Sequence, residues 1–432
     1  MRCHALLSLV ALAAVGCGAD DGGPAATCDP GERPIVLAHG LLAASDTWQS
    51  QALRLRANGY CDSHVRAFDW NTIDQAGAED RLDAFIDAAL AATGASQVDL
   101  VGHSAGGALS YRYLSDPAHA AKVAHYAHVA SPPSDPPGPA GPAGAPLPTL
   151  NVWSEGDEVV ASGDVPGVAN AQVPAQDHYQ VATSSASFEA IWAFLHDGAA
   201  PKTTALDTRG AELSGKALSL GENTPVAGGE VRVFEVDPAT AQRLTADPVA
   251  TFAIASDGAW GPFAATRGAS YELLLRDPTE GARPVHYYLE PAFGVRRFVV
   301  LRSLPTAGLV AALLAAIPYN DAHSVVIAFS SSQAVIHGRD TLSFDALDLA
   351  TEALAAPAQT AIAYFLFDDG EDGVSSGPTD TFSAIVPFFL DAVDAFIPAD
   401  ASATSTLTFN GRSLAVARWP SDSDGTVVAI FD

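Results

Sequence analysis

The sequence predicts an α/β fold over roughly the first half of the chain, followed by an all-β region, and three observations lead to this prediction. Short apolar runs alternate with helix-like segments from residue 33 to residue 200. The pentapeptide GHSAG, residues 102–106, lies between one such run and a helical pattern. Beyond residue 200, short alternating segments are separated by turns rich in Gly, Pro, Asp and Asn.

The first 17 residues predict a lipoprotein-type signal peptide. Arg2 gives a basic start, and the following apolar run is too short to span a membrane. The stretch AAVGC resembles the lipobox of bacterial lipoproteins, which implies that Cys17 is acylated and anchors the protein at the outer membrane or cell surface. Ala14 stands where leucine is more usual, so the alternative is ordinary cleavage and a secreted or periplasmic product. Residues 18–32 then form a flexible tether.

Residues 33–200 predict a catalytic-type α/β domain. RPIVLAHG and HVRAFDW are typical of buried strands, and SDTWQSQALRLRANG between them predicts a helix. EDRLDAFIDAALAATG places its apolar residues at helical spacing and ends at Gly94. KVAHYAHVAS and LPTLNVWSEGD predict further strands, and SSASFEAIWAFLHDG predicts the last helix. This alternation predicts a parallel sheet with helices on both faces. The Pro- and Gly-rich residues 132–148 predict a long loop inside the domain.

VGHSAGG, residues 101–107, predicts a strand that turns sharply into a helix. Gly102 and Gly106 have no Cβ, so they tolerate the close packing and strained backbone of such a turn. Ser104 is then held at the tip of the turn above the sheet edge, which is the geometry of a nucleophile elbow. We therefore expect Ser104 to be a nucleophile.

An activated serine needs a base within reach and a carboxylate behind that base. Asp157 follows a predicted strand, and His178 lies in a loop before the last helix. The chain order and the position at the carboxyl ends of parallel strands predict the triad Ser104, Asp157 and His178. We expect the backbone N–H groups of Leu41 and Ala105 to bind the oxyanion of the tetrahedral intermediate.

Other acids and histidines compete for these roles. Three acids neighbour Asp157, which is preferred because EGD is the tightest turn there; simple turn formation is its non-catalytic alternative. His103 is expected to point away from the nucleophile and to pack in the core. The three neighbouring acids are Glu155, Glu158 and Asp164. The other competing histidines, which are expected to be structural, are His125, His128 and His196.

The region after residue 200 predicts two β domains. Residues 201–303 predict a sandwich and resemble transthyretin-like modules in the order of their strands and turns, and residues 304–432 predict a second, smaller β domain. The stretch FDDGEDGVSS offers Asp368, Glu371 and Asp372 as oxygen ligands for Ca²⁺. Because it lacks a closing acid, a solvated acidic turn is the favoured interpretation.

Charge and cysteines limit the partners and the compartment. The formal net charge of −28 disfavours nucleic acids and anionic membrane surfaces, which are polyanions. An exported compartment permits disulfides, so Cys28 and Cys61, which each precede a predicted strand, are expected to form a bridge. Two unpaired thiols are the alternative.

PIVLAHGLLAASDTWQ, FDWNT and VDLVGHSAGG resemble lipases and esterases of the α/β-hydrolase superfamily. RYLSDPAHAAKVAH, KTTALDTRGAELSGKAL, VHYYLEPAF and WPSDSDGTVVAIFD resemble an archaeal carboxylesterase/lipase with C-terminal β domains. This resemblance implies the α/β-hydrolase fold and a β region that binds lipid and shapes the substrate entrance. The chain has Ser131 where the archaeal relative has its triad acid, which supports Asp157. Where that relative has a helical lid, this chain has only NTIDQAGA after Trp70, so we expect no lid at this position. Without a lid, we expect a preference for shorter esters, unless another segment covers the site.

These observations predict an exported serine ester hydrolase that acts on lipid-like carboxylic esters and needs neither a metal nor an organic cofactor. A thioesterase, an amidase or a polyester depolymerase on the same fold is one alternative. A surface binding protein with a vestigial hydrolase domain is another. The presence of nucleophile, acid and base in order argues against the vestigial domain.

Overall fold

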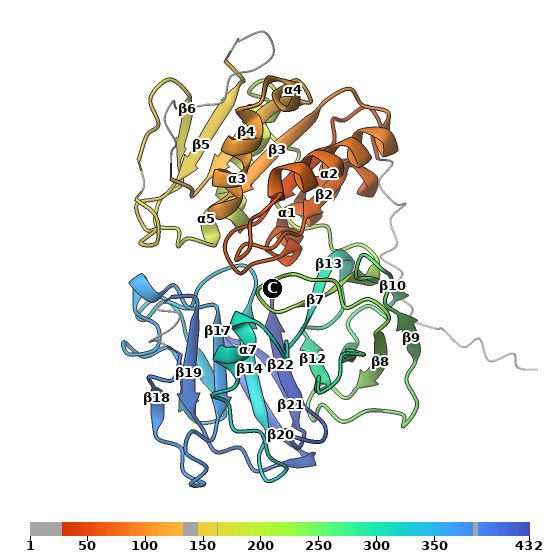
Figure 1. The fold of residues 1–432 in the computed structure, drawn as a ribbon, viewed down its shortest axis with the longest axis vertical. Coiled ribbons are helices and arrows are strands. Elements are labelled where there is room, and N and C mark those ends of the chain that lie inside the picture. Colours follow the sequence, from red (N-terminus) through yellow and green to blue (C-terminus); the bar gives the residue numbers. More distant parts are fainter. Residues whose placement is uncertain (1–27, 133–145, 162, 383–387) are drawn as a thin grey trace, which may run out of the picture.

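The computed structural model describes residues 28–132, 146–161, 163–382 and 388–432. Figure 1 shows an α/β part stacked on a β-rich part, with the C-terminus of the chain where the two meet. The predicted signal peptide, Cys17 and most of the Pro- and Gly-rich stretch lie outside the described residues. Within the described ranges, no helix combines the length and apolar character that crossing a membrane requires.

The α/β part contains a six-stranded sheet in the order β2-β1-β3-β4-β5-β6, and all of its strand pairs are parallel. β3 is buried along its whole length, as expected for a central strand with helices on both faces. The strands are β1 (Ile35–Ala38), β2 (Val65–Phe68), β3 (Val98–His103), β4 (Val123–Val129), β5 (Thr149–Trp153) and β6 (Ala169–Gln172).

Helices follow the strands and cover the sheet. α2 buries Leu82, Ile86 and Ala89 on one face and ends at Gly94, whose φ of 74° suits a residue without a Cβ. The helices of this part are η1 (Ser45–Trp48), α1 (Gln49–Ala57), η2 (Asp62–His64), α2 (Ala78–Thr93), α3 (Ala105–Leu114), α4 (Pro117–Ala120), α5 (Gln180–Thr183) and α6 (Ser185–Leu195).

The β-rich part contains three sheets. The largest has nine strands in the order β18-β19-β17-β14-β22-β12-β11-β8-β9, and the others are β10-β7-β13 and β16-β15-β20-β21. The elements are β7 (Ala211–Ser219), β8 (Glu230–Val236), β9 (Ala250–Ala253), β10 (Ala259–Ala264), β11 (Ser270–Arg276), β12 (Val285–Leu289), β13 (Gly294–Ser303), α7 (Leu309–Leu314), β14 (Val325–Ser330), β15 (Leu342–Phe344), β16 (Leu347–Asp348), η4 (Pro357–Gln359), β17 (Ala363–Phe367), β18 (Gly377–Thr379), β19 (Leu390–Asp394), β20 (Asp400–Phe409), β21 (Arg412–Arg418) and β22 (Thr426–Phe431).

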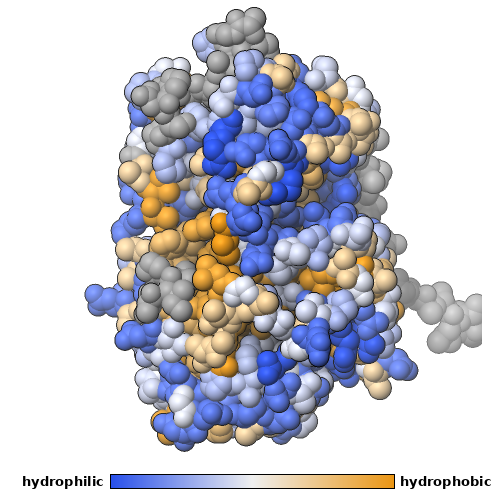
Figure 2. Space-filling model, in the orientation of Figure 1, coloured by the Kyte–Doolittle hydropathy of each residue, from blue (hydrophilic) through white to orange (hydrophobic). Residues whose placement is uncertain are grey.

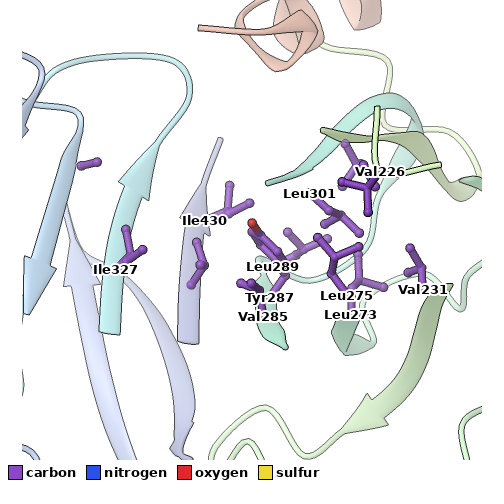
Figure 3. Close-up of a cluster of buried hydrophobic side chains, with 14 of the residues drawn as sticks. Val226, Val231, Leu273, Leu275, Val285, Tyr287, Leu289, Leu301, Ile327 and Ile430 are labelled. Carbon is purple, nitrogen blue, oxygen red and sulfur yellow. The ribbon is translucent and has the colours of Figure 1, made fainter. Parts of the chain in front are cut away.

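The nine-stranded sheet runs across the boundary predicted at residue 303. The last strand, β22, lies between β12 and β14 and pairs with both in parallel. Figure 3 shows the result, a buried apolar cluster to which Leu273 and Tyr287 contribute from one side of β22 and Ile327 from the other. The two predicted β domains therefore share one sheet and one hydrophobic core. Local turn signals mark where strands end, but they do not indicate which distant strands pair.

A disulfide joins Cys28 to Cys61, as predicted. It fixes the start of the described chain beside the residues that enter β2, and Asp29 pairs there with Tyr60 in a single β-bridge. The sequence separation of 33 residues means that the bridge closes a sizeable loop, which restricts the unfolded chain.

Replacing Cys61 with serine is expected to lower the free energy of unfolding by about 3 kcal/mol, because the unfolded chain regains the entropy of the open loop. Urea unfolding of the oxidised protein and of Cys61→Ser measures the difference, and the wild-type protein in reductant is the control. A variant as stable as the oxidised wild type would contradict this role for the bridge.

Buried polar contacts join the two parts of the molecule. Arg302 of β13 donates to both carboxylate oxygens of Asp46 in η1, at 2.6 and 2.9 Å. Gln49 Oε1 accepts the backbone N–H of Phe298 at 2.9 Å. Removing one partner of a buried ion pair costs about 3–5 kcal/mol, because the other charge is left uncompensated. These contacts therefore hold the β-rich part firmly against the carboxyl-end loops of the parallel sheet.

Candidate active site

The elbow at Ser104 has the strained geometry that the sequence predicts. β3 ends at His103 and α3 begins at Ala105, and Ser104 between them has φ 54° and ψ −121°. A non-glycine residue in this region of backbone conformation is strained, and such strain concentrates at functional sites. A Cβ on Gly102 would lie 2.7 Å from the Gly106 carbonyl oxygen, and one on Gly106 would lie 2.4 Å from the Ala38 carbonyl oxygen. Both glycines are therefore required by the close approach of strand and helix.

Asp157 and His178 form a buried pair. His178 Nδ1 lies 2.8 Å from Asp157 Oδ2, and each side chain is 1% exposed. The other carboxylate oxygen of Asp157 accepts the N–H groups of Val159 and Val160, which fixes the carboxylate. The contact between His178 Nδ1 and the Asp157 carboxylate places the imidazole proton on Nδ1 and leaves Nε2 as an acceptor. Nε2 is buried and has no hydrogen-bond partner among the described residues.

His103, the residue before Ser104, contacts the same histidine. Its Nε2 lies 2.9 Å from the His178 carbonyl oxygen, and the two ring centroids are 4.7 Å apart. Burial lowers the pKa of His103 well below its usual value, so the ring stays neutral beside His178. His103 is buried as expected, and its ring packs against His178.

The structure brings His178 next to the elbow without a direct bond to the serine. The described residues contain no hydrogen bond between Ser104 Oγ and His178 Nε2, while the elbow is tied to His178 through His103. In free enzymes the bond between nucleophile and base is often long and shortens when substrate binds. Ser131, at the position of the relative's acid, donates instead to the Ser104 carbonyl oxygen at 2.7 Å and so supports the elbow.

Two of the competing acids, Glu155 and Asp164, have other partners. Glu155 accepts the Gln172 amide and the Ala175 N–H, and Asp164 accepts the Trp153 indole N–H. Among the competing histidines, His125 contacts Asp99, His128 contacts the Tyr126 hydroxyl and His196 contacts the Trp192 carbonyl.

The two expected oxyanion donors lie beside the serine. Ala105 is the first residue of α3, where an N–H has no acceptor within the helix. Leu41 follows Gly40, and a Cβ on Gly40 would lie 3.0 Å from Ser104 Cβ. The loop after β1 therefore passes directly beside Ser104.

An apolar cavity of about 240 Å³ lies between the α/β part and the β-rich part. Leu41 and Tyr179 line it from the first part, and Phe329, Phe389 and Ile430 are among its lining residues from the second. The Phe389 ring stacks on the His178 ring with centroids 5.9 Å apart and an interplanar angle of 15°. Phe389 therefore contacts both the cavity and the histidine of the buried pair, while His178 itself does not line the cavity.

Exposed apolar side chains mark the rim of this cavity. Leu309 on α7 is 62% exposed and Ile73 is 36% exposed, and both line the cavity. Figure 2 shows apolar residues gathered on this face at the level where the two parts meet, with hydrophilic residues towards both ends. Residues 71–77, where the archaeal relative has its lid, contain no helix.

Two residues of the β-rich part hold the loop that carries His178. Arg339 lies 2.8 Å from the buried carboxylate of Asp177 and donates to Gln180. Phe389 has φ 73°, a strained value for a bulky residue, and is fixed by backbone bonds to Gln359 and Ile362. Sequence reasoning missed both residues, because only the distant strand pairing brings them to the site.

The carboxylates of the acidic stretch at residues 367–376 have protein partners. Glu371 accepts the Asn320 amide, Asp372 accepts the Val374 N–H, and Asp368 accepts the Gly373 N–H and faces His323. Across the part of the chain that the structure describes, no group of three or more His, Cys, Asp or Glu side chains is placed to hold a metal ion.

Comparison with protein families agrees with this geometry. Residues 33–146 match the model of the α/β hydrolase fold. The α/β part has the α/β-hydrolase fold. Residues 209–304, which follow this α/β-hydrolase domain, match the model of the lipase C-terminal domain, and residues 329–432 match a further model of a C-terminal domain. The resemblance to lipases and esterases is thereby confirmed, and the chain is a hydrolase by fold and domain content.

Several solved structures from microorganisms are similar to part of this chain. A predicted CIB-like hydrolase from Thermoplasma acidophilum is 21% identical, with 40% of this chain and 89% of that chain covered and a TM-score of 0.30. An esterase from Rhodococcus sp. ECU1013 is 17% identical, with 40% and 94% covered and a TM-score of 0.32. A Bacillus licheniformis lipase in mature form is 15% identical, with 40% and 96% covered and a TM-score of 0.29. A search of curated protein sequences found no match.

Proposed function

We propose that this protein hydrolyses carboxylic esters of apolar acyl chains through an acyl-enzyme on Ser104. One observation carries the proposal: the buried pair of Asp157 and His178, beside the strained elbow, packs against the Phe389 ring, and Phe389 also lines an apolar cavity. A polar substrate group would lose its hydration in such a cavity without gaining hydrogen bonds, which is costly. An acyl chain, in contrast, gains from leaving water.

In the proposed reaction, His178 Nε2 takes the hydroxyl proton of Ser104 as the serine oxygen attacks the ester carbonyl carbon. The N–H groups of Leu41 and Ala105 stabilise the oxyanion, and the imidazolium formed is stabilised by Asp157. His178 then gives its proton to the alkoxide leaving group as the carbon–oxygen bond breaks. A water molecule, deprotonated by His178, attacks the acyl-enzyme and releases the acid and the free serine.

The β-rich part supports a preference for longer acyl chains. The sequence predicts a preference for esters of shorter acyl chains only if nothing covers the site. Here the β-rich part contributes Phe329, Phe389 and Ile430 to the wall of the cavity. Each methylene that leaves water contributes about 0.8 kcal/mol, which corresponds to about a fourfold gain in kcat/KM when the gain is kept in the transition state.

A series of p-nitrophenyl esters from acetate to palmitate tests the proposal. We expect kcat/KM to rise by up to about fourfold for each added methylene until the cavity is filled. Activity that is highest for acetate and falls with each methylene would show that the cavity does not receive the acyl chain.

Filling the cavity is expected to change the chain-length preference. Ala363 is buried on β17 and lines the cavity, so Ala363→Phe places a ring in its volume. We expect kcat/KM for octanoate and longer esters to fall at least about tenfold while acetate hydrolysis stays within about twofold, since only the longer chains lose burial. Ala363→Val is the graded control. An equal loss for acetate and octanoate would point to general distortion instead.

A thioesterase, an amidase or a polyester depolymerase uses the same acyl-transfer chemistry, and a panel of thioester, amide and polyester substrates distinguishes these activities. The buried and hydrogen-bonded Asp157 argues against a vestigial site, because a site without function has no need to keep this pair. Export and anchoring through acylated Cys17 belong to the same proposal, supported by the N-terminal sequence.

A further inference from the structure

A buried asparagine of the β-rich part reaches into the α/β-hydrolase domain. Asn223 follows β7 in a turn and has φ 55°. Its Nδ2 donates to the Ala43 carbonyl at 2.8 Å and to the Trp70 carbonyl at 3.0 Å. It thereby joins the loop after β1 to the loop after β2. The two contacts to these carbonyls are made by the two N–H groups of the Asn223 side-chain amide. The amide oxygen, Oδ1, is buried and has no hydrogen-bond partner within the described ranges.

The same amide faces His39, the residue before Gly40. His39 is fully buried, and burial lowers its pKa, so the ring is neutral. Its Nε2 accepts the Trp70 N–H at 3.2 Å and lies 3.4 Å from Asn223 Nδ2. Because the Trp70 N–H donates to Nε2, the ring proton is on Nδ1, which donates to the Gly40 carbonyl at 2.9 Å.

This chain of contacts ends at an expected oxyanion donor. The carbonyl of Gly40 and the N–H of Leu41 belong to one planar trans peptide and point in opposite directions. Holding the Gly40 carbonyl on His39 therefore fixes the direction of the Leu41 N–H. Gly40 lies directly against Ser104, since a Cβ on Gly40 would be 3.0 Å from Ser104 Cβ.

We infer that Asn223 is a positioning residue for the oxyanion hole, and that the β-rich part is a component of the catalytic centre as well as a substrate-binding region. The inference rests on the proposed acyl transfer at Ser104. Asn223 touches neither the substrate nor the reacting atoms, and it acts through His39 and through the two loops that it joins. A displaced oxyanion donor weakens binding of the transition state more than binding of the ester.

Asn223→Gly is the most informative variant, because glycine adopts a φ of 55° without strain while it removes the side-chain amide. Asn223→Asp keeps the shape but turns a carboxylate oxygen towards two carbonyls. Asn58→Gly is the matched control: Asn58 is also buried and also donates to two carbonyls, those of Arg54 and Thr203, and within the described ranges its side chain forms no hydrogen bond with residues 39–43.

We expect Asn223→Gly and Asn223→Asp to lower kcat about 10- to 100-fold with KM within about twofold, as for a misplaced transition-state donor. The affinity for an alkyl boronic acid, whose serine adduct is tetrahedral, should fall in proportion to kcat/KM across the variants. Asn58→Gly should keep kcat within about twofold of wild type even if its thermal unfolding midpoint falls as far as that of Asn223→Gly.

The outcomes separate this inference from the proposed function on which it rests. If Ser104→Ala abolishes ester hydrolysis and Asn223→Gly leaves kcat unchanged, the positioning role of Asn223 is wrong while the acyl-transfer proposal holds. If Asn223→Gly and Asn58→Gly lose kcat equally, the effect of Asn223 is on stability alone. If Ser104→Ala retains the wild-type activity, or the wild type has none, both the proposed function and this inference are overturned.

Discussion

Replacing Ser104 with alanine is expected to lower kcat for ester hydrolysis by about 10⁴-fold or more, because the acyl-enzyme can no longer form. Binding is expected to persist, since the cavity and the oxyanion donors do not depend on the hydroxyl. Steady-state hydrolysis of p-nitrophenyl butyrate by wild type and variant measures the loss.

Ser131→Ala is the matched control for that experiment. Ser131 is also buried at the elbow and donates to the Ser104 carbonyl, but its hydroxyl is not proposed to react. It should keep far more activity than Ser104→Ala. Comparable losses in the two variants would indicate that elbow structure, rather than a nucleophile, had been removed.

Replacing Asp157 with asparagine is expected to lower kcat by about 10³- to 10⁴-fold. The carboxylate accepts the Nδ1 proton of His178 at 2.8 Å, whereas a carboxamide can present its N–H₂ group and favour the wrong imidazole tautomer. The protein should remain folded, since the side chain keeps its shape. The pre-steady-state rate of Ser104 acylation by p-nitrophenyl butyrate measures the effect directly.

The variants Glu155→Gln and Asp164→Asn test whether Asp157 is the acid of the proposed triad. Both side chains neighbour Asp157 in the chain, and both have partners other than His178. We expect each variant to keep its kcat within about threefold of wild type, because neither substitution removes a reacting group. A loss in either variant as large as that of Asp157→Asn would assign the acid differently.

Much of the α/β-hydrolase domain could be predicted because its signals are local. The run VDLVGH carries Val98, Leu100 and Val101 and forms a strand that is buried throughout, and the glycines on both sides of Ser104 fall where strand and helix approach closely. The pairing of Asp157 with His178 followed from chain order and from the meeting of parallel strand ends at one edge.

The contribution of the β-rich part to the site could not be predicted in the same way. Asn223, Arg302, Arg339 and Phe389 are far from Ser104 in the sequence, and no short motif marks them. Asn223 follows β7 and Arg302 lies on β13 of the three-stranded sheet, whereas Phe389 directly precedes β19 of the nine-stranded sheet. Such long-range pairing is set by the packing of the whole chain.

The structure also changes the expected role of the β-rich part. Phe389 stacks on His178, Arg339 holds Asp177, and Asn223 joins the loops beside the elbow. These contacts act on both the proposed base, His178, and the proposed oxyanion hole. The β-rich part therefore contributes to the geometry of the site in addition to lining the cavity.

Covalent trapping tests the central claim, an acyl-transfer nucleophile at Ser104, most directly. The protein is incubated with an alkyl fluorophosphonate, digested, and the modified peptide is sequenced by mass spectrometry. We predict one stoichiometric adduct on Ser104, whose formation is slowed strongly by Asp157→Asn. The absence of an adduct, or an adduct on another serine with Ser104 unmodified, would contradict the account.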